Sequence, residues 1–374
     1  MKAFFKRITK RYHSPDYLFI ILLGLVLVLG LIFLTSASGV VGLRRFGSTI
    51  YFLQHQILMG LIPGLILLVI FSFVDYRFWR KWATVIFILS LILMALTFVS
   101  GVGLAHGEAR RWISIFGIGF QPAEILKLSF IIYLAAFFDS RQKKIKTWTG
   151  SFLPLVIILG IACALVMAQK DMGTMMVIFM IAISIYFLVG GNLLHMLVLF
   201  GGAVSIFFVL IKAAPYRMAR FITFLYPQMD PLGVGYHINQ ALIAIGSGGI
   251  FGLGLGHSRQ KFLYLPESYG DSIFAVIGEE LGFLTTILVL CLFVAVALRG
   301  LKIAKAAPDF FGQILGGGIL CWFIFQAMIN IGAMLHLFPL TGIPMPLVSY
   351  GGTAMMVLLA AFGILINISR QARE

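Results

Sequence analysis

The chain has 374 residues, of which 61% are hydrophobic and 11% are charged, and its mean hydropathy is +1.04. This composition lies far outside the range of soluble globular domains, and too few residues lie outside apolar runs to build a separate soluble domain. The formal net charge is +15. No nucleic-acid partner is expected, because the basic residues lie in short segments between apolar runs, where membrane topology accounts for them.

Ten apolar runs approach or exceed the roughly 20 residues that a helix needs to cross a bilayer. We therefore predict an all-α, polytopic membrane protein with about ten transmembrane helices, folded as a single membrane domain over residues 1–374. The predicted spans are 17–37, 50–74, 82–100, 122–139, 151–168, 173–190, 193–213, 272–299, 311–336 and 350–369.

The first run is not read as a cleaved signal peptide. Its apolar part, residues 17–37, is about 20 residues long, whereas the core of a signal peptide has roughly 7–15. The cysteines, Cys163, Cys291 and Cys321, all fall within apolar runs. They are expected to be small core residues and not a disulfide or metal set.

The distribution of Lys and Arg predicts the orientation of the chain. If the loops alternate between two sides, the side with both termini carries 17 Lys and Arg residues, against 5 in the short loops of the other side. The positive-inside rule then places both termini in the cytoplasm. Residues 1–16 form a basic cytoplasmic N-terminus, while 101–121 and the large loop 214–271, between the seventh and eighth helices, face outward.

Charge is concentrated at the end of the large outward loop, next to a predicted span. The charged residues there are Arg259, Lys261, Glu267, Asp271, Glu279 and Glu280. Ionisable groups at membrane depth are costly and usually mark a substrate path or a reacting site. Glu279 and Glu280 are expected either to pair with a neighbouring helix or to line a wet cavity.

Asp271 directly precedes the apolar run 272–276, and two interpretations are open at this point. Asp is a favoured N-cap residue, and a capping carboxylate needs no catalytic role. Alternatively, an outward carboxylate next to a basic and aromatic segment could act as a general base where a hydroxyl group must lose a proton.

The stretch 246–256 carries six glycines in eleven residues. Glycine permits close approach of the backbone and positive φ, but no Gly-Lys-Ser/Thr sequence follows, so a nucleotide P-loop is not supported. The pattern favours a tight loop that dips among helices, with close approach to a ligand as the alternative.

A second polar cluster spans Arg110 to Lys127. Arg111 is suited to a phosphate group, because a guanidinium is always charged and can bond two oxygens at once. Glu124 and Lys127 are three residues apart on one predicted helix, so they share a face and are expected to form an ion pair or to contact a ligand. Asp171 precedes another predicted span and is expected to cap it and to help shape a cavity.

Taken together, these motifs resemble the SEDS family (shape, elongation, division and sporulation proteins), the membrane polymerases of bacterial peptidoglycan. The resemblance runs nearly end to end. It rests on Arg111-Trp112, Gln121-Pro-x-Glu-x-x-Lys127, Gln169-x-Asp-x-Gly173, Gly235-Tyr-His-x-x-Gln240, Ile245-Gly-Ser-Gly-Gly249, Leu265-Pro-Glu267, Asp271, Gly278-Glu-Glu-x-Gly282 and Ser349-Tyr-Gly-Gly352.

The segment 254–267 looks more like the FtsW-like division branch, with its sporulation relative, than like the elongation branch. The chain departs from the common family pattern at Gly270 and Ser272, where Thr and Phe are usual, and at Lys170 and Met172, where Pro and Leu are usual. None of these departures removes a charged group.

The resemblance implies a glycosyltransferase that polymerises lipid II into glycan strands outside the cytoplasmic membrane, for septal or other cell-wall synthesis. Asp271 would be the base that deprotonates the acceptor hydroxyl. Arg111, Lys261 and Arg259 would stabilise the pyrophosphate. The remaining substrate-binding residues implied are Gln121, Glu124, Lys127, Asp171 and Glu267.

The resemblance also implies partners, whereas cofactors are left open. A class B penicillin-binding protein, which is a transpeptidase, is the implied partner, together with other divisome proteins and the membrane lipid. A divalent cation, Mg or Mn, could share the charge of the pyrophosphate, although no ligand spacing requires a metal. Two other functions stay open: a lipid II flippase, which needs no base, and a non-enzymatic division scaffold, which needs no outward carboxylate.

Overall fold

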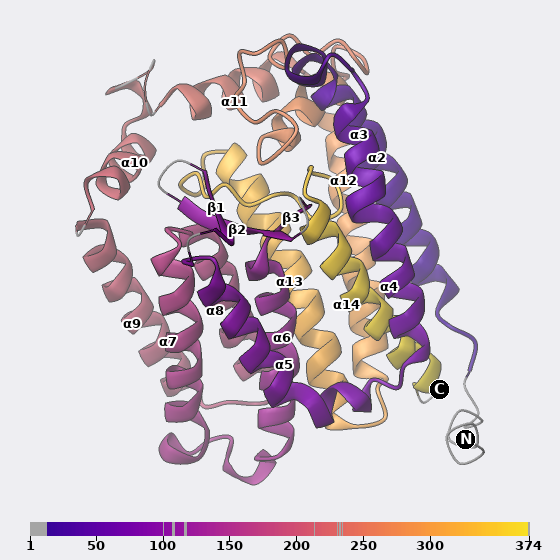
Figure 1. Cartoon of the computed structure of the whole chain (residues 1–374), viewed down its shortest axis with the longest axis vertical. Helices are drawn as coiled ribbons and strands as arrows, with labels where there is room; N and C mark the ends of the chain where they lie inside the picture. The colour runs from indigo at the N-terminus through magenta and orange to yellow at the C-terminus, as the bar shows by residue number, and fades with distance from the viewer. Residues whose placement is uncertain are drawn as a thin grey trace.

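The computed structural model describes residues 13–372, except 100, 107, 108, 116, 117, 213, 230, 232 and 234. Most of the basic N-terminus predicted for residues 1–16 therefore lies outside the described residues. The rest of the chain is a helical bundle with a small sheet and a long, partly helical loop at one end (Figure 1).

Each of the ten predicted spans corresponds to a helical segment, which confirms the all-α membrane fold. The segments are α2 (Tyr17–Phe46), α3 (Tyr51–Gln56) with π-helical η1 (Ile57–Leu61) and α4 (Ile62–Phe73), α5 (Arg77–Leu96), α6 (Pro122–Asp139), π-helical η3 (Trp148–Phe152) with α7 (Leu153–Ala168), α8 (Met172–Leu188), α9 (Leu193–Lys212), α12 (Ile273–Lys305), α13 (Phe310–Met334) and α14 (Gly352–Gln371).

Eight of these segments, among the described residues, are long and apolar enough to cross a membrane. The other two are α8, an apolar helix of 17 residues, and α6, an 18-residue helix that contains Glu124, Lys127 and Asp139. The charges of α6 are tolerable because its polar side chains face the interior of the bundle and not lipid.

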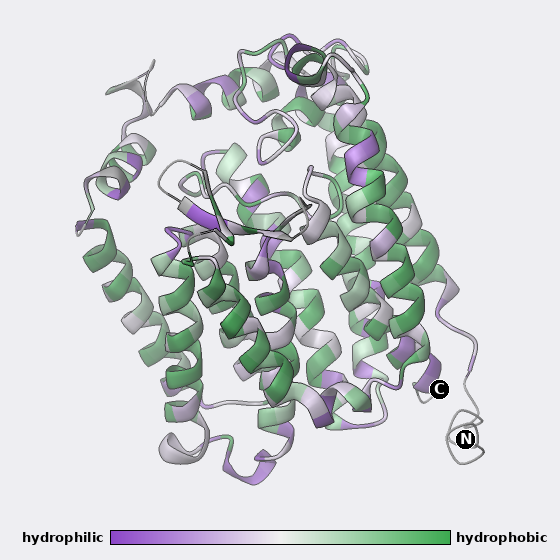
Figure 2. Cartoon of the chain, viewed as in Figure 1, coloured by the Kyte–Doolittle hydropathy of each residue, from purple (hydrophilic) through white to green (hydrophobic). Residues whose placement is uncertain are grey.

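The helices differ strongly in how much of their surface the protein itself covers. In their most apolar stretches, 83% of the residues of α14 and 72% of those of α13 are buried, against 17% for α9. Accordingly α13 and α14 lie inside the bundle, and α9 stands at its edge (Figure 1). Apolar residues cover most of the bundle's length (Figure 2), as expected for a surface that faces lipid.

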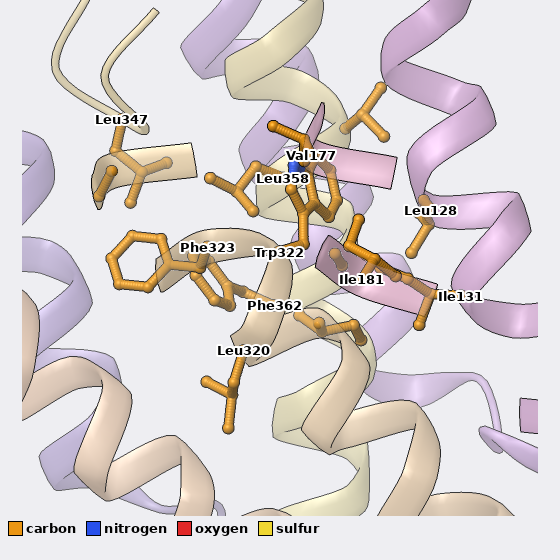
Figure 3. Packing of buried hydrophobic residues seen from close by; sticks show 14 of the residues in the cluster. Leu128, Ile131, Val177, Ile181, Leu320, Trp322, Phe323, Leu347, Leu358 and Phe362 are labelled. Atoms are coloured by element: carbon orange, nitrogen blue, oxygen red, sulfur yellow. The ribbon is translucent and has the colours of Figure 1, made fainter. Parts of the chain in front are cut away.

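The core is built around large side chains of α13 and α14 (Figure 3). The rings of Phe323 and Phe362 meet edge to face with centroids 5.4 Å apart, and Phe293 of α12 stacks on Phe323 at 5.2 Å. Trp322 is 1% exposed. These rings pack α12, α13 and α14 against one another, so they give a rigid support to the polar end of the bundle.

The start of α2 and the end of α14 lie at the opposite end of the bundle from the sheet (Figure 1). The backbone nitrogen of His13 donates to the carbonyl of Arg370 at 2.9 Å, and Asp16 forms an ion pair with Arg299 at 2.8 Å. Asp16 also caps α2 by accepting a hydrogen bond from the backbone nitrogen of Phe19. The chain ends therefore share one side, as the alternation of ten spans predicts.

The segment 101–121, predicted only as a loop, contains a three-stranded antiparallel sheet in the order β1-β2-β3. The strands are β1 (Gly103–His106), β2 (Ala109–Ile115) and β3 (Ile118–Phe120). Ile113 of β2 is buried and pairs with Phe120 and Gly103 on either side. Strands of three to seven residues are too short for their alternation to be recognised beside long apolar runs.

The large loop 214–271 contains two helices, α10 (Pro215–Leu225) and α11 (Tyr236–Ser247), followed by the glycine-rich stretch. That stretch packs against α12: the nitrogen of Leu253 donates to the carbonyl of Glu279 at 3.0 Å, and the nitrogen of Phe283 donates to the carbonyl of Gly249 at 2.9 Å. The stretch is thus a tight loop bonded to one helix, but most of its residues are exposed, so it does not dip among several helices as predicted.

The span predicted as one continuous helix over 272–299 is broken. Gly282 has φ of 72° and ψ of −179°, so α12 is two helices joined at this residue. A Cβ atom at Gly282 would lie 2.2 Å from the backbone nitrogen of Gly252. The break thus exists where the glycine-rich stretch crosses α12, and glycine is required there for both its conformation and the absence of a side chain.

Candidate active site

A cavity of about 860 Å³ lies at the end of the bundle that carries the sheet. Its walls come from the ends of α2, α3, α6, α8 and α14, from β2, and from the segment before α12. It brings together seven of the predicted site residues: Arg111, Gln121, Glu124, Lys127, Asp171, Glu267 and Asp271. These residues lie far apart in the sequence, so the cavity is a product of the whole fold.

Asp271 does not act as the helix cap that one interpretation of the sequence proposed. Ser272 occupies the N-cap position of α12, and no side-chain cap hydrogen bond forms at this described helix start. The Asp271 carboxylate instead lines the cavity, with its Oδ1 atom 3.4 Å from the Ser272 hydroxyl oxygen. A carboxylate that precedes a helix without capping it is available for another role.

The surroundings of Asp271 favour its protonated form. Burial raises the pKa of Asp271 to about 7, and the nearby negative charge of Glu267 contributes to the rise. A backbone hydrogen bond at Asp271, the nearby Ser272 hydroxyl and the positive charge of Arg220 lower the pKa and oppose this rise. A carboxyl group that titrates near neutral pH can both take up and release a proton, as a general base must.

The backbone at Asp271 is held by a buried amide. Asn330 of α13 donates from its side-chain nitrogen to the carbonyl of Asp271 at 2.7 Å and to the carbonyl of Ile343 at 2.8 Å. The amide therefore joins the start of α12 to the segment between α13 and α14. Because Asn330 is 1% exposed, both bonds are shielded from water and fix the position of the carboxylate.

Ser272 is fixed from the side of the large loop. Its hydroxyl donates to the carbonyl of Pro266 at 2.8 Å, and Nε2 of His237 lies 2.5 Å from the same oxygen. Since the hydroxyl proton points to Pro266, His237 must be the donor in the second bond. Burial, helped by the charge of Arg220, lowers the pKa of His237 to about 4, so its ring is neutral at pH 7.

On the opposite wall, Glu124 and Lys127 form the expected ion pair at 2.8 Å, and both are buried. The Lys127 ammonium also donates to Gln326 at 2.8 Å and lies 5.1 Å from the centre of the Trp322 ring. The second carboxylate oxygen of Glu124 is buried and has no hydrogen-bond partner in the described part of the protein. It is therefore able to accept a hydrogen bond from a bound hydroxyl group.

Arg111 of β2 is anchored to the turn between α7 and α8. Its guanidinium donates to the carbonyls of Gln169 and Lys170 at 3.4 and 2.5 Å and lies 3.8 Å from the Asp171 carboxylate. Asp171 caps α8 as predicted, accepting from the backbone nitrogen of Thr174 at 3.0 Å. These bonds hold the sheet against the bundle.

Arg259 and Lys261 are the two predicted site residues that the structure does not bring into the cavity. Lys261 is buried, with its ammonium 2.7 Å from Glu280 and 3.1 Å from the Ser36 hydroxyl. The backbone nitrogen of Arg259 donates to Glu279 at 2.9 Å. Glu279 is bonded by the loop segment 258–260, whereas Glu280 is paired with Lys261 and bonded by Ser36 of α2, so the expected contact with a neighbouring helix forms for Glu280. Lys261 does not line the cavity as expected, because its ammonium is paired with Glu280 beside the break in α12.

Several cavity residues were not predicted. Arg45 donates to the hydroxyl of Tyr269 at 3.4 Å, and the hydroxyl of Tyr350 lies 2.9 Å from Nδ1 of His55. Burial, followed by the charge of Glu267, raises the pKa of Tyr269 to about 12. Arg45 is a basic residue on the outward side, and Tyr350 belongs to the motif Ser349-Tyr-Gly-Gly352, so both had a signal in the sequence, whereas Tyr269 had none.

Among the described residues, no three His, Cys, Asp or Glu side chains gather closely enough to hold a metal ion. Glu124 is paired with Lys127 and Asp171 lies near Arg111, whereas Glu267 and Asp271 lie in one segment and interact through their charges.

The fold and the cavity define a polytopic helical membrane protein with a titratable carboxylate in a polar cavity at one end of its bundle. A family model described as "Cell cycle protein", covering FtsW, RodA and SpoVE, matches residues 16–374. The chain therefore belongs to the FtsW, RodA and SpoVE family, which confirms the resemblance seen in the motifs.

Two relatives extend over almost the whole chain. Stage V sporulation protein E of Bacillus subtilis is 40% identical over 365 residues, covering 98% of this chain and 100% of that protein. A probable peptidoglycan glycosyltransferase FtsW of Trichlorobacter lovleyi is 37% identical over 364 residues, covering 96% and 95%. The chain is thus similar to both division and sporulation members.

Solved structures share the fold. A chain from a structure described as a peptidoglycan synthase complex that coordinates polymerization and crosslinking aligns with a TM-score of 0.78 and 25% identity, over 96% of this chain and 98% of that one. The rod shape determining protein RodA of Thermus thermophilus aligns with a TM-score of 0.72 and 24% identity, over 98% and 100%. The helical arrangement is therefore that of experimentally determined family members.

Proposed function

We propose that this chain is a peptidoglycan glycosyltransferase that polymerises lipid II on the outer face of the bacterial cytoplasmic membrane. The observation that carries the proposal is Asp271, a carboxyl group with a pKa of about 7 that lines a cavity of about 860 Å³ at the end of the bundle away from both termini. Its relatives named as probable peptidoglycan glycosyltransferases support the same activity.

In the proposed reaction, the oxygen of the acceptor 4-hydroxyl attacks the anomeric carbon of the donor sugar. A new bond forms between these atoms while the bond from the anomeric carbon to the pyrophosphate oxygen breaks, and its electron pair leaves with the lipid pyrophosphate. The hydroxyl proton passes to the carboxylate of Asp271, which afterwards releases it to water. Glu124, with one carboxylate oxygen unpaired, is placed to accept a hydrogen bond from a sugar hydroxyl.

The cavity also offers groups to orient the sugars. Arg45 and Arg111 are its charged donors besides the paired Lys127, and Gln121 and Tyr350 are neutral donors on the same walls. Donors fixed by the protein before substrate binds stabilise developing negative charge at little reorganisation cost. Here Arg111 is fixed by its bonds to the turn before α8.

Orientation and partners complete the proposal. We propose that the end with both termini is cytoplasmic, since the short loops at that end carry most of the basic residues. A class B penicillin-binding protein is the proposed partner, because a polymerase supplies the strands that a transpeptidase crosslinks. The similar chain from a peptidoglycan synthase complex supports such an assembly.

The direct test is to incubate the purified full-length protein in nanodiscs with lipid II, with and without a partner transpeptidase, and to resolve the products on gels. We expect glycan strands in at least one of the two conditions. Movement of lipid II across vesicles without polymer formation would support a flippase instead. The absence of both activities, while the partner still binds, would support a scaffold.

A further inference from the structure

A second, smaller cavity of about 70 Å³ lies beside the active-site cavity, and Arg111 lines both. Its other basic residues are Lys170 before α8 and Arg217 and Arg220 of α10. Among the described residues that line it, none is an Asp or a Glu. We call this cavity the basic annex, defined by Arg111, Lys170, Arg217 and Arg220.

The two cavities differ in charge. The active-site cavity is lined by three cations, Arg45, Arg111 and Lys127, and by four acidic residues, Glu124, Asp171, Glu267 and Asp271. A pyrophosphate group placed deep among those carboxylates would be repelled by them. The basic annex presents four cations, three of them guanidinium groups, which match phosphate oxygens in geometry as well as in charge.

The annex also has an apolar wall that a lipid chain can use. Met172 and Met176 line it from α8, and Phe207 and Ile211 line it from α9. The helix α9 stands at the edge of the bundle (Figure 1), and only 17% of its most apolar stretch is covered by the protein. A chain attached to a phosphate in the annex can therefore pass between α8 and α9 into the bilayer.

The basic residues of the annex are held in place by the fold. Arg217 donates from Nη1 to the carbonyl of Leu210, near the end of α9, at 3.1 Å. Arg111 is fixed by the turn before α8. The annex also adjoins the cavity that holds the reacting group, because Arg111 lines both.

We propose that the basic annex binds the pyrophosphate of the isoprenyl-linked donor sugar, with the isoprenyl chain between α8 and α9. This inference rests on the proposed glycosyltransferase function, and it replaces Lys261 and Arg259 as the residues that stabilise the leaving group. The cations of the annex then face the oxygen that gains negative charge as the glycosidic bond to pyrophosphate breaks.

The test measures binding, so that it does not depend on polymerisation. Native mass spectrometry or a competition assay in nanodiscs would give the affinity of the full-length protein for undecaprenyl pyrophosphate, for the phospholipid phosphatidylglycerol and for inorganic pyrophosphate. The variant is Arg217→Gln with Arg220→Gln. The matched control is Arg110→Gln with Lys212→Gln, which removes two exposed charges outside the annex.

We expect undecaprenyl pyrophosphate to bind more tightly than either competitor, and the annex variant to weaken it by about tenfold or more. The affinity of the control variant should stay within about twofold of the wild type, since the charges of Arg110 and Lys212 are exposed and screened by solvent. Equal affinity for phosphatidylglycerol would make the annex a general site for anionic lipid headgroups and overturn the proposal. Equal affinity for inorganic pyrophosphate would show that the isoprenyl chain does not contribute to binding, and would contradict its proposed position between α8 and α9.

The remaining outcomes are also decisive. If the double variant does not fold, Arg220→Gln alone, at an exposed position, should still weaken binding by several-fold. Unchanged binding by a folded annex variant would contradict the proposal even if the wild-type protein polymerises lipid II. Conversely, the annex variant could lose binding while the wild-type protein forms no polymer. That result would support the annex as the pyrophosphate site and contradict the proposed glycosyltransferase function.

Discussion

At the scale of single residues, the environment of Asp271 combines burial with access to the cavity. The backbone is clamped by Asn330, and the neighbouring Ser272 is held by Pro266 and His237. The carboxylate itself keeps few partners: the Ser272 hydroxyl oxygen lies 3.4 Å from it, and the proton of that hydroxyl points to Pro266. A rigid position with a weakly satisfied carboxylate is the arrangement that a proton acceptor needs.

The pH dependence of polymerisation should follow the pKa of Asp271, which is about 7. The base is active when ionised, so we expect the rate to rise between about pH 6 and about pH 8 and then to level off. Glu267→Gln removes a negative charge that raises this pKa, so the rising limb should move to lower pH. Arg220→Gln removes a positive charge that lowers it, so the limb should move to higher pH.

Rates of strand formation from lipid II across this pH range, in the wild-type protein and both variants, provide the measurement. Shifts of the two variants in the same direction, or a flat wild-type profile, would show that a group other than Asp271 controls the rate.

Some of the site could be predicted from residue spacing, and some could not. Glu124 and Lys127 are three residues apart on one helix, so their pairing follows from helix geometry. Asp171 precedes a helix, so its capping role follows from its position. By contrast, Tyr269 and Tyr350 line the cavity because loops that are distant in the sequence pack together. Lys261 does not line it, because its ammonium pairs with the buried carboxylate of Glu280.

At the scale of elements, the break in α12 gives the large loop its anchor. The glycine-rich stretch crosses the break, and its backbone bonds to both halves of the helix. Glu279 and Glu280, just before the break, bind the segment 258–261. The loop that leads to Asp271 is therefore attached to the membrane bundle at a point about three turns from the carboxylate.

The substitution Gly282→Ala tests this anchor. The residue has φ of 72°, and its Cβ would lie 2.2 Å from the nitrogen of Gly252, so both backbone strain and a steric clash arise. We expect a loss of at least about 2 kcal/mol in stability, seen as a lower unfolding temperature in detergent. Gly246→Ala is the matched control, because α11 leaves open space there. Equal unfolding temperatures for the two variants would contradict the anchor.

The helices could be predicted better than the connections between them. Long apolar runs predict the ten spans, because a bilayer requires about 20 apolar residues whatever the tertiary contacts are. The sheet over 103–120 was missed because its strands are short, and the break at Gly282 was missed because an isolated glycine is usually tolerated in a helix. Both features depend on contacts with segments remote in the sequence.

At the scale of the whole molecule, the bundle separates two chemically different ends. One end holds both termini, the Asp16–Arg299 and Arg77–Asp309 ion pairs and most of the basic loops. The other end holds the sheet, the large loop and the active-site cavity (Figure 1). The proposed orientation places the cavity outside the cell, where a substrate that carries its own leaving group can react.

Cysteine labelling tests this orientation. In a background that lacks Cys163, Cys291 and Cys321, Tyr264→Cys in the large loop and Lys144→Cys in the loop after α6 are both at exposed positions. An impermeant thiol reagent applied to intact cells should label the first and not the second, which should react only after the membrane is opened. Labelling of both positions in intact cells, or of neither, would refute the proposed topology.

The central claim is that Asp271 is the general base, and Asp271→Asn tests it most directly. Asn is nearly isosteric and leaves the backbone bond to Asn330 in place, so the unfolding temperature and partner binding should match the wild type. Asn cannot take up the hydroxyl proton, so the rate of lipid II polymerisation should fall by roughly 10²–10⁴-fold. The control is Asp75→Asn, at a half-exposed position at the other end of the bundle, and its polymerisation rate should stay within about twofold of the wild type. A near wild-type rate for Asp271→Asn would contradict the account.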